Sequence, residues 1–120
     1  MEEEVLKCLR GIRAGLVTDE YTLHDIVQAA FDEAGIPYEK EFKLGSGSRV
    51  DYMVNQGIAV EIKKGKPNRT NVIKQLTRYA AFDRVKMLVL VVERNMDVPE
   101  TIEDKPCVSV GLNKNWGIAL

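Results

Sequence analysis

Hydrophobic and polar residues alternate most clearly in the middle of the chain, where two short runs flank a turn. Residues 50–54 and 58–62 are rich in β-branched side chains, and Asn55, Gln56 and Gly57 separate them. A three-residue connection that ends in glycine is typical of a β-hairpin, because glycine supplies the positive φ that a bulged turn needs. The pattern therefore predicts an antiparallel hairpin over residues 50–62.

Side chains alternate between the two faces of a strand, which sorts the residues of this hairpin. The apolar face is expected to carry Val50, Tyr52, Val54, Val60 and Ile62. The other face is expected to carry Arg49, Asp51, Met53, Glu61 and Lys63. Acidic and basic residues on the outer face of an exposed hairpin are ordinary, so this second face needs support from the rest of the chain before it indicates a function.

Apolar residues at helical spacing predict three helices. The first covers residues 2–13, with Gly15 as its stop, and the second begins at Thr22 as N-cap and ends at Gly35. Glu20 and His24 lie four apart at the start of the second helix, so they share a side if it begins early enough. The third begins at Asn68 or Thr70 and runs to about residue 82.

The remaining strands are read from shorter runs. Residues 38–44 read as a strand, and residues 45–48 as a tight turn into the hairpin. The continuous apolar run 87–92 predicts a strand buried on both faces of a covered sheet. Residues 108–110 and 117–120 are expected to add short closing strands, and residues 97–106 to form a loop with one turn of helix.

Length and composition describe one small globular domain. The chain has 120 residues, of which 45% are hydrophobic and 29% charged, and no apolar run is long enough to span a membrane. The acidic start, MEEEV, lacks the basic region of a signal peptide, so we expect a cytoplasmic protein with no membrane partner. Cys8 and Cys107 are isolated and are expected to be free thiols.

Two carboxylates of the hairpin point to a metal-dependent chemistry. If the hairpin is centred on Gln56, Asp51 lies opposite Glu61, with Cβ atoms about 4.5–5.5 Å apart. Two acids this close repel each other, and a hard divalent cation such as Mg²⁺ or Mn²⁺ removes the repulsion. Lys63 would project beside such an ion, where it would orient a water or balance a phosphate. The hairpin therefore predicts a site that cleaves phosphodiesters.

Basic residues gather directly after this hairpin, although the net charge of the chain is only −1. Residues 62–82 hold no acid, and Arg49 lies opposite Lys63 across the hairpin. A segregated basic stretch beside the acidic pair is expected to contact DNA phosphates, although it is also compatible with an ordinary solvated helix face. Besides Lys63, the candidate DNA-binding residues are Arg49, Lys64, Lys66, Arg69, Lys74 and Arg78.

The motifs together resemble those of the PD-(D/E)XK nuclease superfamily. The aspartate motif stands as Arg-Val-Asp at residues 49–51, and the E-x-K motif as Glu-Ile-Lys at residues 61–63. The following helix carries Gln75 and Tyr79, similar to the Q-x-x-x-Y helix of RecB-type nucleases. The resemblance covers roughly residues 20–92.

This resemblance implies an α/β fold of the restriction-endonuclease-like kind. The core would be α-β-β-β-α-β in three layers, with a mixed central sheet between helices. Residues 1–120 would form a single nuclease domain: an N-terminal helix over residues 1–15, the core over residues 20–92 and a closing segment over residues 93–120.

The resemblance also implies Mg²⁺- or Mn²⁺-dependent hydrolysis of DNA. The metal would be held by Asp51, Glu61, the backbone carbonyl of Ile62 and an acid of the first core helix. Glu20 is the best match for that acid, with Asp25 and Glu33 as alternatives. Lys63 would position the nucleophile, and Gln75 and Tyr79 would face the site; the implied catalytic residues are Asp51, Glu61, Lys63, Glu20, Gln75 and Tyr79.

Two other functions remain open on the sequence alone. One is a nucleic-acid-binding or regulatory domain that keeps the scaffold without activity, although the chain retains both acids and the lysine. The other is a protein-interaction domain with no DNA role. The form of the DNA substrate and the choice between endonuclease and exonuclease action stay open. A homodimer, or a helicase or recombination partner, is expected for so small a nuclease, with the N-terminal helix as a candidate interface.

Overall fold

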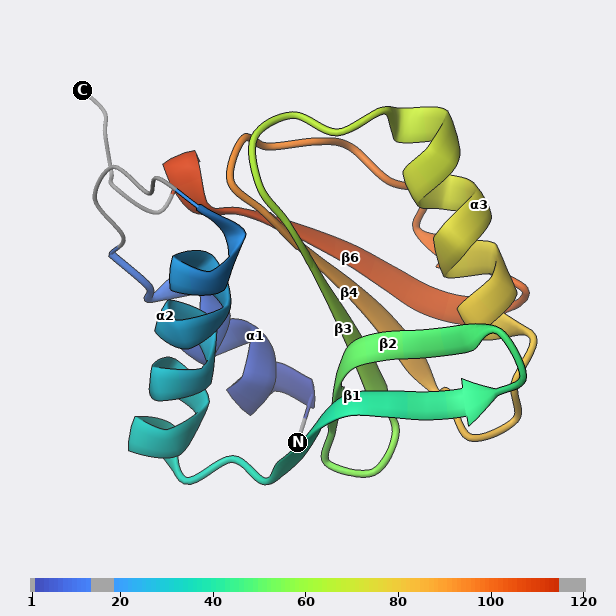
Figure 1. Ribbon diagram of the computed structural model, residues 1–120, viewed down its shortest axis with the longest axis horizontal. Helices are drawn as coiled ribbons and strands as arrows, with labels where there is room; N and C mark the ends of the chain where they lie inside the picture. Colours follow the sequence, from blue (N-terminus) through green and yellow to red (C-terminus); the bar gives the residue numbers. More distant parts are fainter. Residues whose placement is uncertain (1, 14–18, 115–120) are drawn as a thin grey trace.

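The computed structural model describes residues 2–13 and 19–114 of the chain. A mixed six-stranded sheet, in the order β1-β2-β3-β4-β6-β5, separates α1 and α2 on one face from α3 on the other (Figure 1). The predicted α/β class with a mixed sheet is confirmed. The helices are α1 (Glu2–Arg10), α2 (Glu20–Ala34), α3 (Arg69–Ala80) and the short 3-10 turn η1 (Leu112–Lys114). The strands are β1 (Tyr38–Gly45), β2 (Ser48–Val54), β3 (Ile58–Lys63), β4 (Met87–Val92), β5 (Thr101–Ile102) and β6 (Lys105–Gly111).

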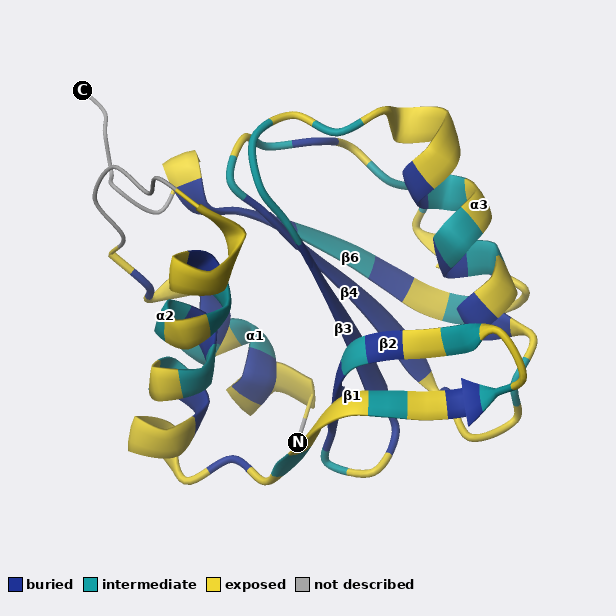
Figure 2. Cartoon of the chain, in the orientation of Figure 1, coloured by how far each residue is buried: buried dark blue, intermediate teal, exposed yellow. Residues whose placement is uncertain are grey.

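The order of the strands explains which of them are buried. β1, β2 and β3 form an antiparallel meander, whereas β4 pairs in parallel with β3 on one side and with β6 on the other. All six residues of β4 are buried, as predicted from its continuous apolar run (Figure 2). A parallel strand with a strand on each side and helices over both faces has no solvated face, which is why the run does not alternate.

Two apolar clusters form the core, one on each face of the sheet. The first includes Leu23, Val27 and Phe31 of α2, packed on alternate residues of β3 and β4. The second includes Val72, Leu76 and Tyr79 of α3, packed on the other set of alternate residues. Both helices are therefore fixed against the same central strands, and this places one of them on each side of the end of β3.

The ends of these helices follow ordinary capping chemistry. The side chain of Asp19 accepts a hydrogen bond of 2.8 Å from the Thr22 N–H, so Asp19 is the N-cap of α2 and the predicted cap at Thr22 is wrong. Aspartate and threonine are both good N-cap residues. Asp19 is the N-cap because the helix begins three residues earlier than its apolar stripe suggests. Gly35 ends α2 at φ 70°, as predicted, and Asn68 caps α3.

The turn of the β2–β3 hairpin uses residues that the sequence pattern did not single out. Asn55 and Gln56 take φ values of 50° and 64°, whereas Gly57 was predicted to supply the positive φ. A 3.1 Å bond from the Gly57 N–H to the Val54 carbonyl closes a tight turn around these two residues. Gly57 serves another purpose, since a Cβ there would lie 3.1 Å from Cγ of Lys86.

Several predicted boundaries and faces are corrected. Val50 was predicted to share a face with Tyr52 and Val54, but it packs in the α3 cluster. The alternation of side chains is irregular at this point, where Glu41 lies opposite Asp51 and has φ 46°. Residues 97–106 hold the short strand β5 and the start of β6 where a helical turn was expected, because they pair at the sheet edge.

The two ends of the chain also differ from the sequence prediction. α1 ends at Arg10, earlier than expected, with Gly11 in the turn that follows it. The predicted helix stop at Gly15 and the predicted strand at 117–120 fall outside the described residues. Within those residues, no helix combines the length and the apolar character that crossing a membrane requires.

Candidate active site

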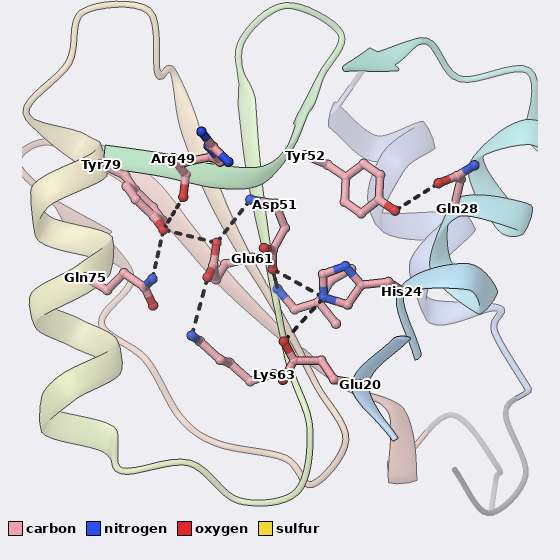
Figure 3. A network of polar contacts seen from close by, with 11 residues as sticks. Glu20, His24, Gln28, Arg49, Asp51, Tyr52, Glu61, Lys63, Gln75 and Tyr79 are labelled. Atoms are coloured by element: carbon pink, nitrogen blue, oxygen red, sulfur yellow. Dashed lines mark hydrogen bonds and ion pairs between the residues drawn. The ribbon is translucent and has the colours of Figure 1, made fainter. Parts of the chain in front are cut away.

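The β2–β3 hairpin opens at the end away from its turn, and the two acids lie at that opening. Tyr52, Met53 and Val54 pair with Val60, Ala59 and Ile58. The same register brings Asp51 opposite Glu61, as predicted. At this end, side-chain carboxylates accept hydrogen bonds from backbone N–H groups of the hairpin. The Ile62 N–H donates to Oδ2 of Asp51 at 2.8 Å, and the Asp51 N–H donates to Oε1 of Glu61 at 3.3 Å (Figure 3).

Glu61 is the only charged residue of the described chain that is buried, with 4% of its surface exposed. It lies in the middle of the sheet because β3 pairs with β4 beside it, at Leu90. Burial, and next the nearby charge of Asp51, raises its pKa to about 7 from an ordinary 4.5. In the absence of a cation the site therefore holds a proton near neutral pH that a surface glutamate would have lost.

Lys63 lies next to this acid, on the same strand. Its Nζ is 3.4 Å from Oε2 of Glu61, and the side chain keeps 27% of its surface exposed. The ammonium group lowers the pKa of Glu61 but does not offset the effect of burial. Lys63 thus has one side against the buried acid and another open to a ligand.

Asp51 turns toward α2, although the alternation predicted one common face for it and Glu61. Its Oδ2 lies 3.7 Å from Nε2 of His24, which in turn lies 3.7 Å from Oε2 of Glu20. Burial raises the pKa of Asp51, while the bond from the Ile62 N–H and the charge of His24 oppose that shift. The structure therefore brings Glu20 to the edge of the site through His24.

His24 lies closer to the acids Asp51 and Glu20 than its sequence pattern indicated. Its Nε2 is buried and has no hydrogen-bond partner among the described residues. The signal in the sequence was its i, i+4 spacing from Glu20, and Gln28 continues the same row of α2 with a 3.1 Å bond from the Tyr52 hydroxyl. Asp25 and Glu33, the alternatives to Glu20, have no such link to Asp51 in the described chain.

Gln75 and Tyr79 of α3 approach the site from the opposite side. The Tyr79 hydroxyl lies 3.2 Å from Oε1 of Glu61 and 2.9 Å from the carbonyl of Arg49, and the amide of Gln75 donates to it at 2.9 Å. Burial raises the pKa of Tyr79, and the charge of Glu61 adds to the effect. The ring is packed in the core, so Tyr79 is a core residue whose hydroxyl fixes the acid.

The candidate DNA-binding residues differ in exposure and in their partners within the protein. Lys66, Lys74 and Arg78 are exposed. The other three have partners within the protein: Arg49 lies 3.5 Å from Glu41, Lys64 lies 3.7 Å from Glu93, and Arg69 donates to the Asp97 carbonyl at 2.9 Å. The Arg49–Glu41 pair is exposed, and exposed ion pairs are weak, so Arg49 remains available to a phosphate.

The residues at the opening have chemical groups that bind divalent cations, although they are not arranged as a complete metal site. No group of three His, Cys, Asp or Glu side chains in residues 2–13 and 19–114 is arranged to hold a metal ion. The candidate donors are instead the carboxylates of Asp51 and Glu61, the Ile62 carbonyl and Nε2 of His24. This nitrogen has no hydrogen-bond partner in the described part of the chain. Hard cations such as Mg²⁺ and Mn²⁺ prefer the oxygen donors of this set, and a positive charge there would offset the burial of Glu61.

Comparisons of the chain with protein-family models, with curated proteins and with solved structures found no match. The function is therefore argued from the residues of this site.

Proposed function

We propose that the protein is a Mg²⁺- or Mn²⁺-dependent deoxyribonuclease of the PD-(D/E)XK type. The observation that carries the proposal is the buried Glu61, placed beside Asp51 and Lys63 where β2 and β3 separate. Burying an acid beside a second acid destabilises a fold unless a cation compensates it. Such strongly perturbed groups gather at functional sites more often than elsewhere in a protein.

The arrangement of the elements supports the same proposal. The run α2-β1-β2-β3-α3-β4 has the order of the restriction-endonuclease-like core that the motifs imply. The three motifs lie on three different elements, and contacts of 3.4 Å or less connect Asp51, Glu61, Lys63, Tyr79 and Gln75. A chance D…E-x-K pattern on a solvated hairpin would not bury its glutamate.

The metal would be held by Asp51, Glu61 and the Ile62 carbonyl, with His24 as a further donor and Glu20 behind it. When bound, it would lower the pKa of a water and draw charge from the phosphate. In hydrolysis a water oxygen bonds to phosphorus while one bond from phosphorus to a sugar oxygen breaks. Lys63, beside Glu61 and partly exposed, would donate a hydrogen bond to that water and orient its lone pair toward phosphorus.

Tyr79 and Gln75 would act through Glu61 and not on the substrate. The Tyr79 hydroxyl has one proton and two acceptors within reach, Glu61 and the Arg49 carbonyl. It holds the glutamate against rotation while the other carboxylate oxygen, Oε2, stays beside Lys63. Outer partners of metal ligands commonly matter 10–100-fold for affinity or activity.

The experiment is cleavage of a panel of labelled DNAs with Mg²⁺, with Mn²⁺ and with EDTA. The panel contains single-stranded, blunt-duplex, flapped and four-way molecules. We expect metal-dependent cutting that Glu61→Ala abolishes, with Glu39→Ala, an exposed acid on β1, as the matched control for contamination. Binding without cutting by the wild-type protein would favour the non-catalytic DNA-binding alternative. The absence of both binding and cutting would refute the proposed site.

A further inference from the structure

Tyr21 is the one large apolar side chain, within the part of the chain that the structure describes, that is left mostly exposed. It has 85% of its surface in solvent. It belongs to the first turn of α2, directly after Glu20. A tyrosine with this exposure contributes little to the core, and its ring is accessible to a ligand.

Helical spacing places Tyr21 at the rim of the candidate site. Glu20, His24 and Gln28 form the row of α2 that faces the end of β2, as their contacts with Asp51 and Tyr52 establish. Tyr21 is three residues before His24 and therefore its neighbour on the helix surface, one step farther from the core. Tyr21 therefore lies beside the helix row that borders the site, and it is not itself one of the acids of that site.

The two helices that flank the site differ sharply in charge. α3 and the segment before it, residues 62–82, hold six basic residues and no acid. Residues 19–34, which contain α2, hold five acids and neither lysine nor arginine. Figure 3 shows the site between these helices, with Gln75 and Tyr79 on one side and His24 and Glu20 on the other.

A DNA duplex and a single strand would interact differently with these two helices of unlike charge, the acidic α2 and the basic α3, called below the acidic wall and the basic wall. A duplex carries phosphates on both strands and would present some of them to the acidic wall, where they are repelled. A single strand can turn its phosphates to the basic wall and its bases away from it. Proteins that bind single strands combine a basic track with aromatic rings on which bases stack.

We propose that Tyr21 is a stacking platform for an unpaired base next to the phosphate that is cut. The inference rests on the proposed nuclease function for the identity of the ligand. It deepens that function by assigning DNA that is single-stranded at the cut as the substrate class. The phosphates lie along α3 and its preceding segment, and a base lies against the ring on the acidic side.

The test is DNA binding by fluorescence anisotropy in a Glu61→Gln background, which blocks cutting, with Mg²⁺ present. The ligands are a single-stranded oligonucleotide, the same strand with one abasic position moved stepwise, and the blunt duplex. Tyr21→Ala is compared with Tyr21→Phe, which keeps the ring, and with Thr22→Ala, the adjacent exposed residue on α2.

Tyr21→Ala is expected to weaken binding of the single strand about tenfold, the effect of losing one stacked base. Binding of the duplex should not change, and the Phe and Thr22→Ala variants should bind as the parent does. One abasic position should weaken binding to the parent by a similar factor and have no further effect on Tyr21→Ala.

Equal binding of the single strand by the Ala and Phe variants, equal losses for single strand and duplex, or no binding of single strands would overturn the inference. The proposed function fails separately. If the wild-type protein cuts no DNA with either metal while the Tyr21 effect persists, catalysis is refuted and the stacking platform stands. If the wild type cuts and Tyr21→Ala binds unchanged, only the stacking platform is refuted.

Discussion

The two ends of the β2–β3 hairpin are built by opposite means from the same pair of strands. Near the turn, backbone pairs with backbone, and the side chains that pack between the sheet and the helices are apolar. At the open end, Asp51 and Glu61 accept from backbone N–H groups, and an acid is buried among hydrophobic residues. The closed end stabilises the hairpin, and the open end gives up part of that stability to hold charged groups in fixed positions.

The largest expected effect is the loss of activity on removing an acid from the open end. Asp51→Ala should reduce metal-dependent cleavage by at least a hundredfold, more than the loss of an outer partner would. The fold should survive, because relief of the repulsion on Glu61 offsets the lost bond from the Ile62 N–H. Cleavage rates and thermal unfolding measure the two quantities, and an unfolded variant would instead assign Asp51 a structural role.

The next effect separates two buried tyrosines that differ in what their hydroxyls hold. Tyr79→Phe removes the bond to Glu61 and should lower kcat roughly 10–100-fold. Tyr52→Phe removes a bond to Gln28 and should leave kcat nearly unchanged. Both variants should lose about 1 kcal/mol of stability. Equal effects of the two substitutions on kcat would show that Tyr79 acts through packing alone.

A smaller effect is expected in the pH dependence of the metal-free protein. Glu61 has a pKa of about 7 in the native protein and an ordinary value of 4.5, taken here for the unfolded chain. Between these values the native protein binds more protons than the unfolded one, so stability is full below the lower pKa and falls as pH rises through the higher one.

The loss over that window should reach up to about 3 kcal/mol, and Glu61→Gln should flatten it because the amide does not titrate. Urea unfolding in EDTA at pH 5 and pH 8 measures the difference. Parallel behaviour of the wild type and the variant would contradict the assignment of this effect to Glu61.

The smallest effect belongs to the closed end. Gln56 lies at φ 64°, a conformation that a side chain with a Cβ disfavours. Gln56→Gly should therefore stabilise the protein by about 1 kcal/mol without changing cleavage. Gln56→Ala, which keeps the Cβ, is the control and should bring no gain. A change in cleavage by the glycine variant would show that the two ends are coupled.

The sequence predicted most elements of this fold because its strongest signals are local. Apolar periodicity places α2 and α3, and the run that forms β4 can be read directly. Glycine at position 57 suggested the turn, but the positive φ values fall at Asn55 and Gln56, and Gly57 instead lies where a Cβ would approach Lys86. The face of Val50 was missed because regular alternation does not hold between Val50 and Tyr52, where Glu41 on the neighbouring strand has an irregular backbone.

The candidate site was predictable as a set of residue types and not as a geometry. The register of the hairpin brings Asp51 opposite Glu61, as a turn centred on Gln56 predicts, whereas alternation wrongly predicted one common face for them. The link from Asp51 through His24 to Glu20 depends on how α2 packs on the sheet, which no local pattern contains. The burial of Glu61 likewise arises from β4, a strand that lies more than twenty residues later in the chain.

The position of β4 has a consequence for how the chain is completed. Its six apolar residues need β3 on one edge and β6 on the other, and β6 ends at Gly111. A chain that stops before Lys105 would leave one edge of an apolar strand with unpaired backbone groups, a template for pairing with other chains. Pairing of β6 thus covers that edge of β4 and removes the template for aggregation, besides extending the sheet.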